Sequence, residues 1–179
     1  PFSPMCGPGW VWDAVGGFCY QLNPDAKLDW PAARADCISK GSDLMSIVSL
    51  HEQSFVSALI LSDAGHGTAS YWIGANDRDD TSGWRWSDGS PFRWVNWIPG
   101  QPDRKEEHCV ALIALHGMWN DDDCPDLKPY ICKKSSIQAT TVAPSPTTAP
   151  PNCNSWPMLS GFHSLQDGLM TSSSNLNKD

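Results

Sequence analysis

Hydrophobic positions recur at helical spacing in residues 29–41, DWPAARADCISKG. Asp29 can accept a hydrogen bond from a free amide of the first turn, and Pro31 fits there because that turn does not need its missing N–H. Gly41 is typical of the position just past a helix end. The pattern therefore predicts a helix, and the residues on its buried face are Trp30, Ala33 and Cys37.

A second helical pattern begins at Ser49, where the spacing Ser49-x-x-Glu52 matches a capping box. We expect this helix to run toward Gly65 through the hydrophobic residues Phe55, Ala58 and Leu59. The other hydrophobic runs are short and bounded by turn residues, which is typical of strands. They predict strands over 17–22, 71–75, 83–89, 109–115, 117–121 and 129–134. The fold class expected from this order is α+β, with a second half rich in loops.

The composition changes at about Ser135. Before it, the chain carries most of its 10 Trp and can bury a core. Residues 135–152 are rich in Ser, Thr and Pro and are expected to form an extended linker. Residues 153–179 are too few and too polar to fold alone, so we expect a disordered tail or a fragment of a next module. The folded domain is therefore predicted to span residues 1–134.

The net charge of −8 argues against a nucleic-acid partner, because phosphates would repel the chain. No apolar run approaches the ~20 residues of a membrane-spanning helix, so no transmembrane segment is expected in this chain. The sequence opens at Pro1 with neither Met nor an apolar leader. We expect a processed product or part of a larger protein.

Seven cysteines are spread along the chain without a Cys-x-x-Cys pair. This distribution favours disulfides and an extracellular, oxidising compartment over a zinc site or a thioredoxin-like site. Cysteines that ligate a metal are the alternative. Six of the cysteines precede residue 135, whereas Cys153 lies beyond it. Cys153 is therefore a candidate for a disulfide partner or an oligomer contact.

Residues 100–124, GQPDRKEEHCVALIALHGMWNDDDC, concentrate carboxylates and side-chain amides between and beside two cysteines. Like charges at this density repel one another unless water solvates them or a cation holds them. The residues alone leave both interpretations open. No Gly-x-Ser-x-Gly, His-Glu-x-x-His or phosphate-binding loop occurs, so an enzyme is not expected. A metal-dependent hydrolase built on these carboxylates is the rival interpretation.

A series of motifs runs along residues 6–134: GPGWVWDAVGGFCY, WPAARADC, YWIGAND, WRWSDGSPFRWVNWIPGQPD, HCVAL, WNDDDC and PYICKK. In their order and spacing they resemble the C-type lectin-like domains. The first motif, with Cys6 and Cys19, resembles the long form of the family, which has an N-terminal hairpin. The run through residues 86–102 resembles mannose-receptor or proteoglycan types. The resemblance implies three disulfides: Cys6–Cys19, Cys37–Cys132 and Cys109–Cys124.

The resemblance also implies that one calcium ion is held by five side chains: Gln101, Asp103, Glu107, Asn120 and Asp121. All five bear oxygen, the ligand atom that calcium prefers. Pro102 stands where the family usually has a cis peptide bond. Asp122 and Asp123 lie outside this set and are expected to be solvated or structural. Of a second calcium site only Asp77 remains, since its other positions hold Thr81 and His108, so that site is not predicted.

In the family, a Gln-Pro-Asp motif goes with galactose-like hydroxyl pairs. Strong galactose binders carry an aromatic residue soon after it, where this chain has Arg104 and Lys105. Weak affinity for a monosaccharide, or a shifted preference, is therefore expected, and Arg104 and Lys105 are candidates to contact a sulfated or sialylated glycan. Arg104 is counted among the carbohydrate-binding residues, together with the five calcium ligands. Trp119 precedes two ligands and is expected to be buried, which would fix their positions. The Trp residues expected in the core or packed under loops are Trp72, Trp84, Trp86, Trp94 and Trp97.

The resemblance implies a calcium-dependent lectin that is secreted or part of an ectodomain. Its partners would be glycans or glycoproteins, of galactose or N-acetylgalactosamine type, and it would perform no chemistry. The alternative is a lectin-like domain that binds a protein, or ice, and uses calcium only as a structural ion.

Overall fold

The first helix, α1 (Trp30–Ser39), forms as its sequence pattern predicts in the computed structural model, which describes residues 6–63, 69–79 and 81–136. The Asp29 carboxylate caps it by accepting a hydrogen bond from the Ala32 amide at 2.8 Å. Its buried side chains are those of Trp30, Ala33 and Cys37. The linker and tail predicted from residue 135 onward, with Cys153, lie almost wholly outside the described residues.

The second helix, α2 (Leu50–Ser62), differs from its sequence pattern in two respects. Ser49 caps it through the Glu52 amide, but the Glu52 carboxylate accepts a hydrogen bond from the Val48 amide at 2.7 Å instead of closing the capping box on Ser49. The buried positions are Glu52, Gln53, Val56 and Ile60, whereas Ala58 is exposed. Phe55 and Leu59 are partly buried and pack against the core, but the hydrophobic pattern did not mark the buried polar residues Glu52 and Gln53.

The Glu52 carboxylate is used in the core. It is almost fully buried and forms an ion pair with Lys133, and the Tyr20 hydroxyl donates a hydrogen bond to it at 3.3 Å. A buried charge needs such partners, because burial without them costs several kcal/mol. The three residues belong to different elements, so this contact joins α2 to the sheet.

The eight strands of the described residues form one sheet in the order β1-β2-β8-β4-β6-β7, with β3 paired to β8 and β5 paired to β4. The strands are β1 (Val11–Asp13), β2 (Phe18–Leu28), β3 (Asp43–Leu44), β4 (Ser70–Asn76), β5 (Arg85–Trp86), β6 (Cys109–Ile113), β7 (Trp119–Asp122) and β8 (Lys128–Ser135). The α+β fold class is thus confirmed. Of the strand expected over 83–89, only the residues of β5 pair.

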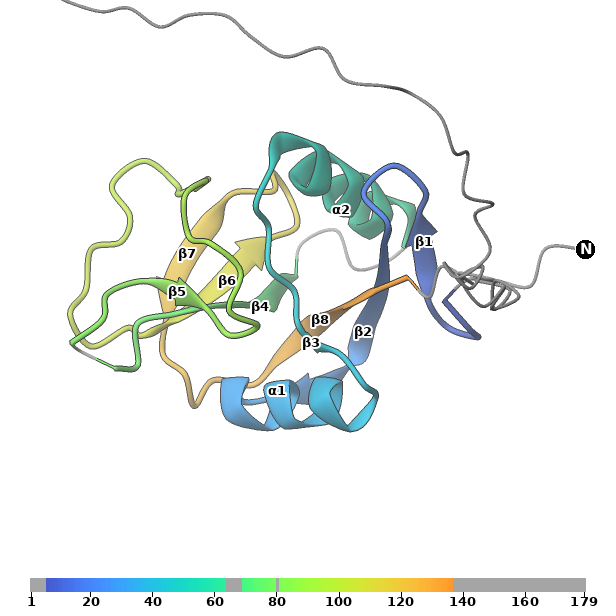
Figure 1. Ribbon diagram of the computed structural model, residues 1–179. Helices are drawn as coiled ribbons and strands as arrows, with labels where there is room; N and C mark the ends of the chain where they lie inside the picture. Colours follow the sequence, from blue (N-terminus) through green and yellow to red (C-terminus); the bar gives the residue numbers. More distant parts are fainter. Residues whose placement is uncertain (1–5, 64–68, 80, 137–179) are drawn as a thin grey trace, which may run out of the picture. The chain divides into compact units, whose positions relative to one another are not determined.

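The two helices cover opposite faces of the sheet (Figure 1). Alternate residues of β4 explain this: Tyr71 and Ile73 join the hydrophobic cluster that includes α2, whereas Trp72 joins the cluster that includes α1. Neither helix has the length and hydropathy to cross a membrane, and the described part of the chain contains no other that does.

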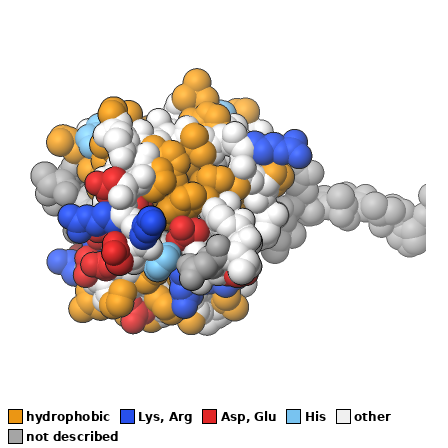
Figure 2. All heavy atoms as spheres, turned by 90° about the vertical axis from the view of Figure 1, so that its left-hand side faces the viewer, with side chains coloured by type: hydrophobic (Ala, Val, Ile, Leu, Met, Phe, Trp, Pro, Cys, Tyr) orange, Lys and Arg blue, Asp and Glu red, His pale blue; other side chains and the backbone are white. Residues whose placement is uncertain are grey.

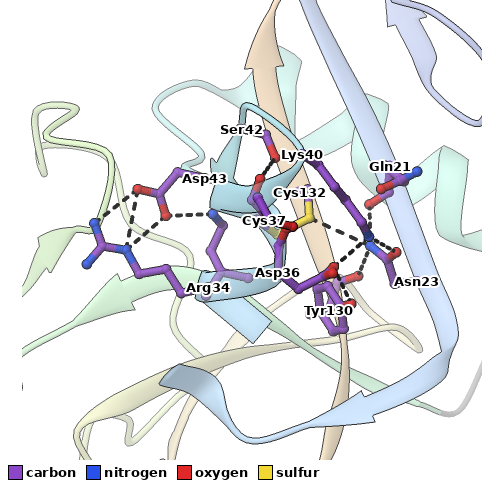
Figure 3. Close-up of a disulfide and its surroundings, with 12 residues drawn as sticks. Gln21, Asn23, Arg34, Asp36, Cys37, Lys40, Ser42, Asp43, Tyr130 and Cys132 are labelled. Atoms are coloured by element: carbon purple, nitrogen blue, oxygen red, sulfur yellow. Dashed lines mark hydrogen bonds and ion pairs between the residues drawn. A yellow bond between two sulfur atoms is a disulfide. The ribbon is translucent and has the colours of Figure 1, made fainter. Parts of the chain in front are cut away.

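Three disulfides tie the sheet together: Cys6–Cys19, Cys37–Cys132 and Cys109–Cys124. Cys37–Cys132 joins α1 to β8, and Figure 3 shows the polar side chains that surround it. Cys109–Cys124 joins the start of β6 to the segment after β7. These are the pairs that the family resemblance implies, and the last of them lies at the base of the acidic stretch.

Candidate functional site

The acidic stretch is positioned by two segments, the long loop between β5 and β6 and the strand β7. Backbone hydrogen bonds fasten the loop to β7: the Trp119 amide donates to Asn96 at 2.8 Å, and the Ile98 amide donates to Trp119 at 2.9 Å. The loop then turns at Gly100, whose φ of +98° favours glycine, into a cis peptide bond between Gln101 and Pro102.

The side chain of Trp119 anchors the point where the loop is bonded to β7. Its ring is fully buried, and it packs edge-on against the rings of Trp86, Trp94 and Trp97 at centroid distances of 5.3, 5.5 and 5.9 Å. Its indole Nε1 donates to Gln53 Oε1 at 3.0 Å. The expected burial of Trp119 is confirmed. Gln53 is a positioning residue that the sequence did not reveal, because nothing in a helical pattern marks a buried glutamine as a partner of a distant Trp.

Three carboxylates converge at the junction of loop and strand. Ligand oxygens of Asp103, Glu107 and Asp121 all lie within 4.8 Å of one another. Asp121 is fully buried and Glu107 is nearly so, whereas Asp103 is exposed. Figure 2 shows acidic side chains grouped with basic ones on the face that carries these loops, beside a broad hydrophobic area. Three carboxylates in so small a space repel one another unless a positive charge lies among them.

Two buried oxygens at this site have no hydrogen-bond partner among the described residues, namely Gln101 Oε1 and Asp121 Oδ1. Buried polar atoms are nearly always paired, since an unpaired one costs free energy. Amide and carboxylate oxygens are both ligand types that a calcium ion takes from a protein. The residues present therefore fit a calcium ion.

The electrostatics of the site agree with this fit. Burial raises the pKa of Glu107, and the carboxylates of Asp121, Asp122 and Asp123 add to the rise while Arg104 opposes it. Burial also raises the pKa of Asp121, against hydrogen bonds from backbone amides that lower it. Both shifts mean that a negative charge is unfavourable here without a cation close by.

Arg104 lies against the same carboxylates. Its Nη1 donates to Glu107 Oε1 at 3.0 Å, and its backbone amide contacts Asp121 Oδ2 at 3.4 Å. The side chain of Arg104 is 67 % exposed, so this ion pair holds it only weakly. The last member of the set, Asn120, is half-buried and donates its amide to the Asp121 carbonyl.

The neighbouring acidic residues have other partners. Asp122 forms an ion pair with Lys128 at 2.8 Å, and Asp123 is exposed. At the positions of the family's second calcium site, His108 Nδ1 lies 2.9 Å from Asp77 Oδ1. Thr81 does not join this pair, because its hydroxyl donates to Asp79 at 2.7 Å.

A family model for the lectin C-type domain matches residues 26–134. The chain belongs to the C-type lectin domain family. Its resemblance to that family is thus confirmed, and members of the family bind carbohydrate rather than catalyse reactions. Domains of this family generally bind calcium.

The lectin domain is 39% identical to human C-type mannose receptor 2 over 146 residues, which are 80% of this chain and 10% of that protein. The chain thus spans about a tenth of that receptor. It is 36% identical over 135 residues to the galactose-specific lectin nattectin of Thalassophryne nattereri, covering 74% of this chain and 82% of nattectin.

Solved structures show the same fold. The carbohydrate-recognition domain of the mouse scavenger receptor C-type lectin has a TM-score of 0.64 and 35% identity, with 73% of this chain and 97% of that one covered. A calcium-independent type II antifreeze protein has a TM-score of 0.65 and 29% identity, with 74% of this chain and 95% of that one covered.

Proposed function

We propose that this lectin domain binds galactose-type glycans through one calcium ion. The ion would be held by five side chains: Gln101, Asp103, Glu107, Asn120 and Asp121. The observation that carries the proposal is the convergence of three carboxylates, whose ligand oxygens lie within 4.8 Å of one another. Two buried oxygens of the proposed set, Asp121 Oδ1 and Gln101 Oε1, lack a hydrogen-bond partner among the described residues. The three disulfides and the extracellular relatives support a secreted or ectodomain location.

The bound ion would offer open coordination positions to two neighbouring hydroxyls of a sugar. The side chains of the site would then select among sugars by hydrogen bonding. A carboxylate such as that of Asp103 only accepts, whereas the amide of Gln101 also donates. The order of donor and acceptor around the site therefore matches one arrangement of hydroxyl groups and rejects another.

Galactose and N-acetylgalactosamine are the sugars that the Gln101-Pro102-Asp103 motif favours. The likeness to nattectin, a galactose-specific lectin, supports the same choice. Arg104 is exposed at the edge of the site and can turn from Glu107 to a hydroxyl or an acidic substituent of the glycan. The partners of this domain would thus be glycans or glycoproteins that end in galactose-type sugars.

The experiment is a binding assay of the purified domain on immobilised galactose, N-acetylgalactosamine and mannose, in calcium and in EDTA. We expect retention on the galactose-type supports in calcium, release by free galactose and no retention in EDTA. Full binding in EDTA would refute the calcium mechanism. Preference for mannose would refute the sugar assignment and leave the ion site intact.

The second candidate is a domain that binds ice or a protein ligand and uses calcium only as a structural ion. The likeness to a calcium-independent type II antifreeze protein favours ice binding without calcium coordination of the ligand. Thermal hysteresis of the purified domain tests ice binding directly. A protein ligand would be captured regardless of free galactose, whereas a glycoprotein held through its sugar would be released.

A further inference from the structure

A cavity of about 470 Å³ lies between the first turns of α1, the end of β4 and the strand β5. Its lining includes Arg34, Arg78 and Arg85 and the rings of Trp30 and Trp86. None of the five proposed calcium ligands takes part in it. Its volume is in the range of sites for small molecules, which is roughly 300–1,000 Å³. The cavity is thus a second site, separate from the carboxylates.

The three arginines differ in how firmly they are held. Arg34 is fixed, because its guanidinium donates to Asp43 at 3.1 Å (Figure 3). It also donates to the Ser87 carbonyl at 2.8 Å. Arg85 pairs with Asp79 at 3.1 Å, but both side chains are nearly half exposed, so that ion pair is weak.

Arg78 is exposed and lies over the Trp30 ring, 5.3 Å from its centroid. It forms no ion pair with any residue that the structure describes. Arg78 and Arg85 come from the end of β4 and the start of β5, which pair through Asn76 and Arg85. Arg78 can therefore receive a ligand directly, whereas Arg85 would first exchange its exposed contacts with Asp79 and with the Ser82 hydroxyl, to which it donates at 2.8 Å.

The polar groups of this lining are chiefly hydrogen-bond donors. A guanidinium only donates, and Trp86 Nε1 is a buried donor that has no acceptor among the described residues. Asp43 and Asp79 supply negative charge beside the cavity, but each is already engaged by an arginine. The lining itself holds three arginines and no carboxylate, on a chain whose net charge is −8. This chemistry fits an oxyanion and opposes a cation or a neutral sugar.

We propose that the cavity binds the oxyanion of an acidic glycan, a sulfate ester or a uronic or sialic carboxylate, without calcium. The guanidinium groups of Arg78 and Arg85 bind the anion, and Arg34 adds a fixed positive charge to the lining. Guanidinium groups suit this role because they bind planar or tetrahedral oxyanions through two N–H groups at once. The site goes beyond the proposed lectin activity, since it uses neither the ion nor the Gln-Pro-Asp motif.

The test is calorimetric titration of the whole chain in EDTA with a heparin-derived sulfated tetrasaccharide. The variants are Arg78→Gln and Arg85→Gln, and the matched control is Arg93→Gln, an exposed arginine that does not line the cavity. We expect each cavity variant to weaken binding by about tenfold, because each loses a charge-assisted hydrogen bond. The control should bind like the wild type. Unchanged thermal unfolding shows that the variants are folded.

Two further probes identify the source of the oxyanion. The desulfated tetrasaccharide keeps its carboxylates, and sialyllactose offers one carboxylate alone. Binding of either assigns a carboxylate, and binding of the sulfated form only assigns a sulfate ester. The proposal is overturned if the wild type binds none of the probes in EDTA, or if Arg93→Gln costs as much as the cavity variants. Calcium plays no part in this assay, and Arg104 of the proposed lectin site is unchanged in both cavity variants. If those variants bind like the wild type, the oxyanion binds outside the cavity and the proposal is overturned.

Discussion

Asp121 is the residue on which the candidate calcium site depends most. It is fully buried, one of its oxygens has no partner among the described residues, and two other carboxylates lie within 4.8 Å. We expect Asp121→Asn to abolish measurable calcium binding while leaving the domain folded. In EDTA the variant should melt at the same temperature as the wild type or higher, because a buried negative charge beside two others is removed.

Calorimetry with calcium and thermal unfolding in EDTA check this prediction. Asp122→Asn is the control, since Asp122 is paired with Lys128 outside the proposed ligand set. It should keep calcium binding. If Asp121→Asn retained the wild-type affinity, the carboxylate cluster would be only a solvated acidic surface.

Arg104 competes with a cation for Glu107, because its guanidinium already occupies one carboxylate oxygen at 3.0 Å. Removing that charge frees the oxygen and lowers the local repulsion of a divalent ion. We expect Arg104→Gln to raise calcium affinity about threefold, the size of effect expected of an exposed charge pair. Calcium titration measures this change, and Lys105→Gln, the control, should change calcium affinity less. If both variants changed the affinity equally, the cause would be the net charge of the loop and not the contact between Arg104 and Glu107.

Gln101 and Asp103 set the hydrogen-bond pattern that a sugar meets. The double variant Gln101→Glu with Asp103→Asn keeps the count of oxygens and the net charge, and only exchanges which position donates. A site built to hydrogen-bond one hydroxyl strongly rejects a wrong arrangement. We expect loss of galactose binding, gain of mannose binding and little change in calcium affinity, measured on sugar supports and by calorimetry. Retained preference for galactose would place selectivity elsewhere.

The site itself could not be deduced from hydrophobic patterning. Gln101, Asp103 and Glu107 lie in a loop without periodicity, and Asp121 reaches them only because β7 is fastened to that loop. Acidic residues that are close in sequence behave differently, as Asp122 shows by pairing with Lys128. Only the family resemblance separated the proposed ligands from their neighbours.

At the scale of elements, signals that act within one turn were the most predictable. The Asp29 cap and the buried face of α1 depend on local spacing, and both form. The capping box of α2 does not close, because Glu52 is recruited by Lys133 from a strand about eighty residues further along the chain. β1 and β3 have 3 and 2 residues, which is too few for an alternating pattern to show.

The contact between α1 and β8 depends on the charge of Asp36. The Asp36 carboxylate accepts hydrogen bonds from Lys40 at 2.5 Å and Tyr130 at 2.6 Å (Figure 3). Burial alone would raise the pKa of Asp36, but these two partners outweigh it and lower the pKa below its usual range. A carboxyl group with a lowered folded pKa stabilises the fold above its unfolded pKa, and the gain is lost as pH falls through the folded value.

We therefore expect Asp36→Asn to lower the free energy of unfolding at pH 7 by about 1 kcal/mol, the typical value of such a contact. The difference from the wild type should shrink below about pH 4, where the wild-type carboxyl group also becomes protonated. Urea unfolding from pH 7 to pH 3 measures it. Asp123→Asn, at an exposed aspartate, is the matched control. A difference that stayed constant with pH would assign the effect to packing.

At the scale of the whole molecule, the fold is held by parts that do not include the candidate calcium site. The two hydrophobic clusters lie on opposite faces of the sheet, and Cys37–Cys132 joins residues 95 positions apart. The loop that carries three of the proposed ligands is attached at one edge, where Cys109–Cys124 spans only 15 positions. The two disulfides should therefore act on different properties.

Replacing each disulfide by a pair of alanines separates stability from function. Chain-entropy models assign about 4.7 kcal/mol to a loop of roughly 100 residues and about 3 kcal/mol to one of roughly 15. Loss of Cys37–Cys132 should therefore lower the free energy of unfolding by about 1.7 kcal/mol more than loss of Cys109–Cys124. Calcium affinity should follow the opposite order, because Cys109 lies two residues after Glu107 and Cys124 lies just after β7, which carries Asn120 and Asp121. Urea unfolding and calcium titration of both variants measure the two effects. If Cys37–Cys132 removal weakened calcium binding as much as removal of the other bridge, the site would depend on the whole core.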